Sequence, residues 1–288
     1  MDTSRFRVRP GEMVRLRRYS PGDTAPFKNK RKAAGRLERG IARLTALQEQ
    51  LYAQDRWAVL LIFQAMDAAG KDSAIKHVMS GLNPQGTQVY SFGRPSDEEL
   101  DHDYLWRTTK ALPERGRIGI FNRSYYEEVL VVRVRPDVLG RQKLPASLVT
   151  RQLWRDRYED INAFERYLWR NGTLIRKFFL HVSKEEQRRR FMQRLDDPAK
   201  HWKFEAADLD ERGRWDEYAR AYEQALARTS TRHAPWFIVP ADHKWFTRLV
   251  IAELVVEALE SLELRFPAVT KAQLEALAEA RKRLGSEP

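Results

Sequence analysis

The sequence contains no cysteine. This absence excludes a disulfide framework, a thiolate metal site and a cysteine nucleophile, so packing alone must stabilise the protein. The sequence also lacks a run of about 18 apolar residues, which a membrane-spanning helix needs, and its N-terminal segment has no apolar stretch typical of a signal peptide. We therefore expect a cytoplasmic protein that makes no membrane contact.

Positive charge is abundant and unevenly distributed. The net charge is +12, and residues 5–39 carry 12 Lys or Arg against 3 Asp or Glu, a net +9. Such a segment attracts polyanions of several kinds, including nucleic acid, acidic lipid and inorganic polyphosphate, and charge alone does not choose among them. A solvated basic arm without a dedicated ligand explains the same composition.

Hydrophobic periodicity predicts a single large α/β unit for these 288 residues, of which 42% are hydrophobic. Helical spacing of leucines predicts an amphipathic helix over 30–53, just before an apolar strand that begins at Val59. Further strands are expected at 87–92, 117–122, 173–182 and 236–239. Helices are expected at 97–111, 145–169 and 242–262, with Ser96 as an N-cap, while 129–134 stays unassigned. Strands that alternate with helices predict a mainly parallel sheet with covered faces.

The most informative segment, residues 59–78, reads VLLIFQAMDAAGKDSAIKHV. A strand-like run breaks at Ala68-Ala69-Gly70-Lys71 and then enters a helix, which is the anatomy of a phosphate-binding loop. The backbone N–H groups and the dipole at a helix start favour an anion. Gly70 lets the backbone approach closely, and Lys71 can neutralise a transferring phosphate.

The match to the pattern G-x-x-x-x-G-K-[ST] is incomplete, because two of its four fixed positions depart. Ala65 stands where the pattern has glycine, and Asp72 stands where it has a hydroxyl, with Ser73 one residue late. Asp67 offers a carboxylate to a metal in place of that hydroxyl. The alternative is an ordinary strand and helix whose first turn carries Gly-Lys.

A second candidate motif follows the strand at 117–121. Asn122 offers a neutral carbonyl where a P-loop enzyme usually keeps its second metal ligand, so Asp67 would carry more of the metal's charge. The planar guanidinium of Arg123 suits bidentate contact with phosphate. Glu127 is a candidate to orient or deprotonate a phosphate nucleophile, although a solvated helix carboxylate is an equal alternative.

A third segment, KEEQRRRFMQRLDDPAKHWK at 184–203, has the composition of a mobile lid. Its cations are candidates to close over a charged substrate and exclude water. An exposed basic helix is the alternative for each single arginine. The cations concerned are Arg188, Arg189, Arg190, Arg194 and Lys203.

Three stretches together resemble the polyphosphate kinase 2 family, most of all its class III branch. They are DAAGKDSAIKHVMSGLNPQG at 67–86, FNRSYYEEVLVVRV at 121–134 and KFFLHVSKEEQRRRF at 177–191. The resemblance runs from about Lys30 to Leu262. It implies a thymidylate-kinase-like P-loop fold, an α/β three-layer arrangement with a mainly parallel sheet and a helical lid. It also implies phosphoryl exchange between inorganic polyphosphate and AMP, ADP or ATP that depends on Mg²⁺, with Mn²⁺ as a substitute.

The resemblance implies catalytic roles for Asp67, which also holds the metal, and for Lys71, Asn122, Arg123 and Glu127. Asn122 agrees with class III, since other branches have aspartate there. We assign phosphate or polyphosphate contact to a wider set: Ala68, Ala69, Gly70, Asp72, Ser73, Lys30, Arg31, Lys32, Lys76 and Arg133. Arg188, Arg189 and Lys203 are assigned to the lid.

The expected organisation is a basic arm and helix over 1–55, a phosphotransferase core over 56–265 with a lid at about 184–212, and a peripheral helix over 266–288. We expect a homo-oligomer, a dimer or a tetramer, that does not bind nucleic acid. An ATP-dependent nucleoside monophosphate kinase is the nearest alternative. A basic nucleic-acid-binding protein with a P-loop-like segment is a further one.

Overall fold

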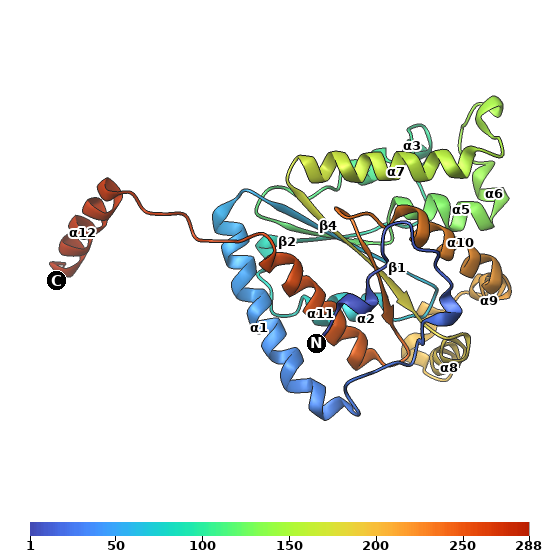
Figure 1. Ribbon diagram of the computed structural model, residues 1–288, viewed down its shortest axis with the longest axis horizontal. Coiled ribbons are helices and arrows are strands. Elements are labelled where there is room, and N and C mark those ends of the chain that lie inside the picture. Colours follow the sequence, from blue (N-terminus) through green and yellow to red (C-terminus); the bar gives the residue numbers. More distant parts are fainter. Residues whose placement is uncertain (288) are drawn as a thin grey trace.

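A five-stranded sheet forms the centre of the protein (Figure 1). The computed structural model describes residues 1–287. All four strand pairings are parallel, in the order β2-β3-β1-β4-β5, which confirms the predicted parallel sheet. The strands are β1 (Ala58–Ala65), β2 (Thr87–Ser91), β3 (Ile118–Asn122), β4 (Thr173–His181) and β5 (Trp236–Pro240).

Helices cover both faces of the sheet, which completes the three-layer α/β arrangement. One face packs against α1 (Lys30–Gln54), α2 (Lys71–Val78) and α11 (Lys244–Glu260). The other packs against α7 (Leu153–Arg170), α10 (Trp215–Thr229) and the 3-10 helix η4 (Tyr125–Val129). The remaining α-helices are α3 (Asp97–Leu100), α4 (Trp106–Thr109), α5 (Val131–Val134), α6 (Pro136–Leu139), α8 (Lys184–Leu195), α9 (Ala207–Gly213) and α12 (Lys271–Gly285).

The apolar run of β1 is buried on both sides because β1 lies in the middle of the sheet. Successive side chains of a strand point to opposite faces. Val59, Leu61 and Phe63 accordingly enter the core beneath α1 and α11, whereas Leu60 and Ile62 enter the core beneath α7 and α10. The loop after β1 therefore emerges at the centre of the sheet's carboxyl edge, where parallel α/β proteins bind ligands.

The predicted helix over 30–53 is confirmed as α1, whose N-cap Asn29 accepts a hydrogen bond from the amide of Lys32. It runs parallel to α11, because two ion pairs join the helices in the same order along both. Arg36 pairs with Glu253, and Arg43 pairs with Glu260. The start of α1 consequently lies at the same end of the molecule as the start of α11.

The basic N-terminal segment, residues 1–29, follows the outer edge of the sheet. The amide of Val8 donates to the carbonyl of Trp236 at 2.9 Å, and Arg7 forms an antiparallel bridge with Phe237. Phe6 and Val14 are buried in the two cores. This segment also includes the 3-10 helices η1 (Ser4–Phe6) and η2 (Leu16–Arg18). It covers the exposed hydrogen-bonding edge that β5 would otherwise present.

Two predicted helices are wrong in extent. The 97–111 segment forms two short helices, α3 and α4, because Asp103 between them accepts from the amide of Leu105 at 2.9 Å and interrupts the helix. The N-cap prediction at Ser96 is confirmed by a complete capping box. The helix predicted over 145–169 begins only at Leu153. The preceding residues form a turn in which the hydroxyl of Thr150 accepts a hydrogen bond from the amide of Gln152.

Other elements fill the connections. The unassigned segment 129–134 ends η4 and forms the short helix α5. The further 3-10 helices are η3 (Pro84–Gly86), η5 (Ala146–Leu148) and η6 (Pro198–Lys203). Helix α12 stands apart from the main body at the end of an extended connection (Figure 1), and its side chains are exposed. Within residues 1–287, no helix has the length and apolar character that crossing a bilayer demands.

Candidate active site

The loop between β1 and α2 has the backbone of an anion cradle. Gly70 has φ 96° and Ala68 has φ 58°, so the chain passes through the left-handed region twice in three residues. A left-handed backbone favours glycine, which explains Gly70. Lys71 follows as the first residue of α2, and the amide of Ala74 already bonds to the carbonyl of Gly70 at 2.9 Å. The unpaired amides of the helix start lie at the carboxyl edge of the sheet.

The departure at Ala65 has a structural explanation. Ala65 is the last residue of β1 and is in register with Leu180 of β4, and its backbone is not left-handed. No glycine is required there. The loop obtains its reversed conformation at Ala68 and Gly70 instead.

The second predicted motif lies beside this loop, because β3 pairs with β1. The guanidinium of Arg123 lies 3.5 Å from the carboxylate of Asp67 and 3.9 Å from that of Glu127. Arg123 itself has φ 64°, a strained conformation for a side chain other than glycine. The amide of Arg123 donates to the carbonyl of Phe63 at 3.0 Å, which ties the turn to β1. The structure thus brings Asp67, Arg123 and Glu127 together, as the sequence predicted.

The pKa values of the two central cations, Lys71 and Arg123, are shifted in opposite directions. Burial lowers the pKa of the Lys71 ammonium, and the neighbouring Arg123 charge lowers it further. Glu127 raises the pKa of the Arg123 guanidinium, and Asp67 adds to that effect. The site therefore has an ammonium that an added anion would stabilise, next to a guanidinium whose charge is already partly neutralised.

The oxygen atoms at the site fit a hard divalent cation. The side-chain amide of Asn122 donates to Asp72 at 2.8 Å, while its carbonyl oxygen is buried and has no hydrogen-bond partner. Asp67 supplies a carboxylate that is 35% exposed. Within residues 1–287, no group of three or more His, Asp or Glu side chains could hold a metal by itself. A site of this kind suits Mg²⁺, which usually binds one or two carboxylates together with substrate phosphates.

Helix α8 supports the phosphate loop from behind, through a residue that the sequence assigned to a mobile lid. Arg190 is only 4% exposed. Its guanidinium donates to the carbonyls of Ala68 at 2.9 Å, Ala69 at 2.7 Å and Ala241 at 2.6 Å. The expectation that Arg190 closes over a substrate is therefore wrong, because its donors are consumed by backbone carbonyls. Gln187, which the sequence analysis did not single out, donates to the carbonyl of Asp67 at 2.9 Å.

Arg194 is half-buried and pairs with Asp208 of α9, whereas the other three lid cations are exposed and have partners within their own segment. Arg188 contacts Glu185 at 3.1 Å, and Arg189 contacts Glu186 at 2.6 Å. The ammonium of Lys203 lies 4.7 Å from the ring centre of Trp202 in η6. These three predicted residues therefore do not touch the phosphate loop within the described part of the chain.

Two cations that the sequence analysis missed flank the loop from α11. The guanidinium of Arg248 donates to the hydroxyl of Ser73 at 2.9 Å, so this predicted phosphate-binding hydroxyl already accepts a hydrogen bond from the protein. Lys244 passes close to Gly70, where an added Cβ would lie 3.9 Å from the lysine Cε. No local signal marked either residue, because a helix that begins Lys-Trp-Phe-Thr-Arg looks like ordinary core packing.

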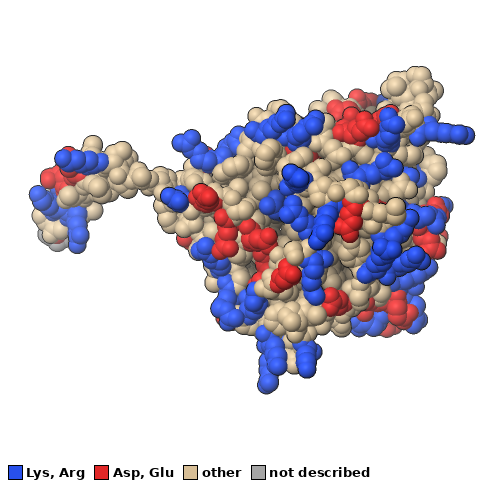
Figure 2. All heavy atoms as spheres, in the orientation of Figure 1, with Lys and Arg blue, Asp and Glu red and all other residues tan. Residues whose placement is uncertain are grey.

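The basic start of α1 lies at the same end of the molecule. Lys30, Arg31 and Lys32 are exposed there, and Figure 2 shows Lys and Arg side chains projecting from this lowest part of the view. Because α1 and α11 run parallel, these cations lie at the end where Lys244 and Arg248 flank the loop. Positive side chains thus continue from the loop toward the surface.

Two predicted phosphate-binding residues have other surroundings. Lys76 is exposed on α2, on a part of that helix beyond the first turn. Arg133 donates to the hydroxyl of Tyr158 at 2.9 Å and lies 5.6 Å from the ring centre of Trp154, both on α7. Within residues 1–287, the structure brings neither of them into contact with the phosphate loop.

Comparisons with known proteins agree on one family. The model of the family described as polyphosphate kinase 2 (PPK2) matches residues 28–267. An ADP-polyphosphate phosphotransferase of Rhodopseudomonas palustris is 52% identical over 284 residues, 98% of either chain. An AMP/ADP-polyphosphate phosphotransferase of Meiothermus ruber is 46% identical, covering 91% of this chain and 95% of the relative. The crystal structure of polyphosphate kinase 2 from Arthrobacter aurescens superposes with a TM-score of 0.86 at 39% identity, covering 97% of both chains.

Proposed function

The chain belongs to the polyphosphate kinase 2 family, and from this membership we propose that it transfers phosphoryl groups between inorganic polyphosphate and adenine nucleotides. AMP is converted to ADP, and ADP to ATP. The observation that carries the proposal is the near full-length similarity to two phosphotransferases whose names specify polyphosphate with ADP or with AMP and ADP. Assignment to the class III branch, which uses both acceptors, is part of the proposal.

The reaction requires no covalent enzyme intermediate. An oxygen of the nucleotide's terminal phosphate attacks the terminal phosphorus of polyphosphate in line. A new P–O bond forms as the bond to the rest of the polyphosphate breaks, so the polyphosphate leaves one residue shorter. The protein contributes mainly position and charge.

The catalytic roles follow from the contacts around the loop. The ammonium of Lys71 and the guanidinium of Arg123 offset negative charge on the transferring group. Glu127, 3.9 Å from Arg123, would orient the attacking nucleotide phosphate through Arg123 or through the metal bound to that phosphate. The loop backbone from Ala68 to Gly70, supported by Arg190, cradles phosphate oxygens. The lid cations Arg188, Arg189 and Lys203 meet substrate only if their segment closes, which excludes water.

Asp67 and the unpartnered carbonyl oxygen of Asn122 would hold Mg²⁺. When bound, the metal supplies charge neutralisation between the two phosphate chains. Mn²⁺ accepts the same carboxylate and carbonyl ligands. In the resting protein Asp72 orients Asn122 through the 2.8 Å hydrogen bond between their side chains.

The polyphosphate path follows the cations that lead away from the loop. Its near part uses Lys244 and Arg248 of α11, and its far part uses the exposed Lys30, Arg31 and Lys32 at the start of α1. A long polyanion gains from cations that succeed one another along its length. Contact of Lys76 and Arg133 with polyphosphate stays a prediction. Lys76 lies on α2 and Arg133 lies against α7, so any such contact would be made away from the phosphate loop.

The decisive test omits ATP. Purified protein is incubated with Mg²⁺ and long-chain polyphosphate, together with AMP, ADP, GMP or GDP in parallel. We expect ADP to appear from AMP and ATP from ADP. An ATP-dependent nucleoside monophosphate kinase would instead be inactive until ATP is supplied, and that result would overturn the proposal. A nucleic-acid-binding role predicts instead that binding of nucleic acid survives in a Lys71→Ala protein.

The lowered pKa of Lys71 predicts an early loss of activity at alkaline pH. In the free enzyme the ammonium loses its proton below the ordinary lysine value of 10.5, because burial disfavours the charge. Bound phosphate favours the ammonium and raises its pKa again. We therefore expect kcat/KM, which reports the free enzyme, to fall with rising pH sooner than kcat, which reports the complex.

The residual activity of a Lys71→Ala variant is the control for this profile. It lacks the ammonium, so its kcat/KM should stay level over the pH range in which the wild type declines. An identical decline in both proteins would assign the titration to another group.

The remaining expectations from the sequence stay predictions. They are a cytoplasmic location, a dimer or tetramer, and the division into 1–55, 56–265 and 266–288, with the lid at about 184–212. Pro288 lies outside the described residues. Static light scattering of the purified protein measures the subunit number directly.

A further inference from the structure

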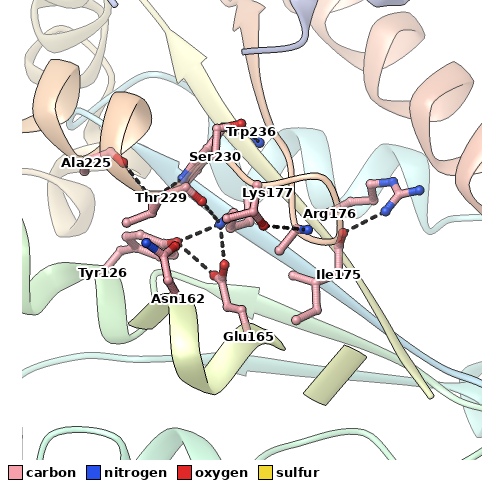
Figure 3. A network of polar contacts seen from close by, with 12 residues as sticks. Tyr126, Asn162, Glu165, Ile175, Arg176, Lys177, Ala225, Thr229, Ser230 and Trp236 are labelled. Carbon is pink, nitrogen blue, oxygen red and sulfur yellow. Dashed lines mark hydrogen bonds and ion pairs between the residues drawn. The ribbon is translucent and has the colours of Figure 1, made fainter. Parts of the chain in front are cut away.

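A buried polar cluster surrounds the hydroxyl of Tyr126 (Figure 3), a residue of the turn η4 that follows Arg123 and carries Glu127. Its centre is an ion pair between Glu165 of α7 and Lys177 of β4, whose side chains are both 0% exposed and whose charged atoms are 2.5 Å apart. Neither residue touches the phosphate loop, and the proposed reaction does not use them. The cluster therefore needs another explanation.

Two consecutive tyrosines of η4 donate hydrogen bonds to the carboxylate of this ion pair. The hydroxyl of Tyr125 donates to Glu165 Oε1 at 2.9 Å, and that of Tyr126 donates to the same oxygen at 2.8 Å. The ammonium of Lys177 donates to Glu165, to the Tyr126 hydroxyl at 2.8 Å and to the carbonyl of Thr229 at 2.7 Å. All three ammonium donors are thus satisfied, and one carboxylate holds both tyrosines.

Stability alone does not account for such a pair. The desolvation penalty of two buried charges offsets much of their attraction, and apolar side chains of similar volume often replace a buried ion pair without loss. What apolar side chains cannot supply is a charged oxygen that accepts from two hydroxyl groups at once. The distinctive effect of Glu165 and Lys177 is therefore the orientation of Tyr125 and Tyr126.

The turn above the cluster requires such an anchor. Arg123 is held at φ 64°, and a strained conformation persists only where the surroundings over-determine it. The backbone side is held by the bond from the Arg123 amide to Phe63 and by the Ser124 hydroxyl, which accepts from the Tyr126 amide at 3.1 Å. The side chains of the turn are held by the hydrogen bonds that Tyr125 and Tyr126 donate to Glu165. Arg123 and Glu127, which flank the two tyrosines in the sequence, then lie beside each other, with Arg123 also in contact with Asp67.

We propose that Glu165 and Lys177 are positioning residues, which hold η4 through Tyr125 and Tyr126 so that Arg123 and Glu127 keep their places opposite Asp67. This inference rests on the proposed function, since Arg123 and Glu127 act on the transferring phosphate. The cluster contacts Tyr125 and Tyr126 and makes no hydrogen bond with Arg123 or Glu127, so it contributes through geometry alone.

Tyr126→Phe tests the proposal, because it removes one hydroxyl and keeps the ring. We expect kcat to fall about 10- to 100-fold, as a small misplacement of catalytic groups does. KM for polyphosphate should change by less than about twofold, since the cations of the polyphosphate path on α1 and α11 are untouched. Hydrogen exchange in the peptide that contains residues 123–129 should become faster.

Ser230→Ala is the matched control. The Ser230 hydroxyl is also buried and also makes two hydrogen bonds, donating to the carbonyl of Val8 at 2.7 Å and accepting from the amide of Trp236 at 3.1 Å. It should lower the melting temperature as Tyr126→Phe does, without the change in kcat or in exchange over 123–129. Equal kcat and equal exchange in the two variants would overturn the proposal.

Two further comparisons keep the test decisive. If Tyr126→Phe fails to fold, Tyr125→Phe removes a single bond to the same carboxylate and leaves Lys177 untouched. If the wild type transfers no phosphate from polyphosphate, the proposed function fails. The exchange measurement still decides whether the cluster holds the turn.

Discussion

Replacing Lys71 with alanine lowers kcat by about 10²- to 10³-fold, the usual effect of removing one charge-stabilising group. The reason is that the Lys71 ammonium is the cation at the first position of α2, directly after the loop. The fold should persist, because burial already disfavours the ammonium in the empty protein, as its lowered pKa indicates. We expect the melting temperature of Lys71→Ala to equal or exceed that of the wild type.

The measurement is single-turnover transfer from polyphosphate to AMP, accompanied by circular dichroism of both proteins. Lys282→Ala, which removes an exposed lysine from the detached helix α12, is the control and should keep wild-type kcat. A folded Lys71→Ala protein with near-normal turnover would remove Lys71 from the reaction.

The second large effect concerns stability. Arg190→Ala should lower the free energy of unfolding by about 3–5 kcal/mol, because it removes the donor to the carbonyls of Ala241 and Asp242, and each buried acceptor left unsatisfied costs about 1–3 kcal/mol. Glu186 keeps Arg189 as a partner, so the broken ion pair contributes little. The carbonyls of Ala68 and Ala69 lose their donor at the same time. The loop then loses its support, so kcat should fall as well.

Urea unfolding measures this loss of stability. If the dependence of the unfolding free energy on urea concentration is unchanged, the loss appears as a lower midpoint concentration of urea. Arg188→Ala is the control, because Arg188 lies only two residues away in the same helix but in an exposed pair with Glu185, and exposed pairs contribute less than about 1 kcal/mol. If both variants unfold at the same urea concentration, Arg190 does not support the loop.

The difference between these two arginines could not be read from the chain. Residues 188–190 are three consecutive arginines in a polar helix, and each has the same local pattern. Helix geometry turns one of them toward the protein, but which one depends on where α8 packs. Its contacts with Ala68, Ala69 and Ala241, which lie far away in the sequence, distinguish Arg190 from its two neighbours.

The buried cluster under η4 was hidden from sequence analysis for a related reason. Glu165 lies in a helix rich in charged residues and looks ordinary there. Lys177 lies in an apolar strand and looks like an exception. They become partners because α7 crosses the face of β4 and brings the carboxylate over the ammonium. A buried charge is explained only by its partner, and here the partner lies on another element.

The sequence by itself determined the parallel α/β architecture, the phosphate loop at Gly70 and Lys71, and the pairing of that loop with Asn122 and Arg123. These features depend on periodicity and backbone preference, which act over a few neighbouring residues. Only the tertiary structure decided that Arg190 bonds to the carbonyls of the loop, that Lys244 and Arg248 flank the loop, and that Glu165 accepts from both Tyr125 and Tyr126. Those roles depend on contacts between residues far apart in the chain, and packing of whole elements sets such contacts.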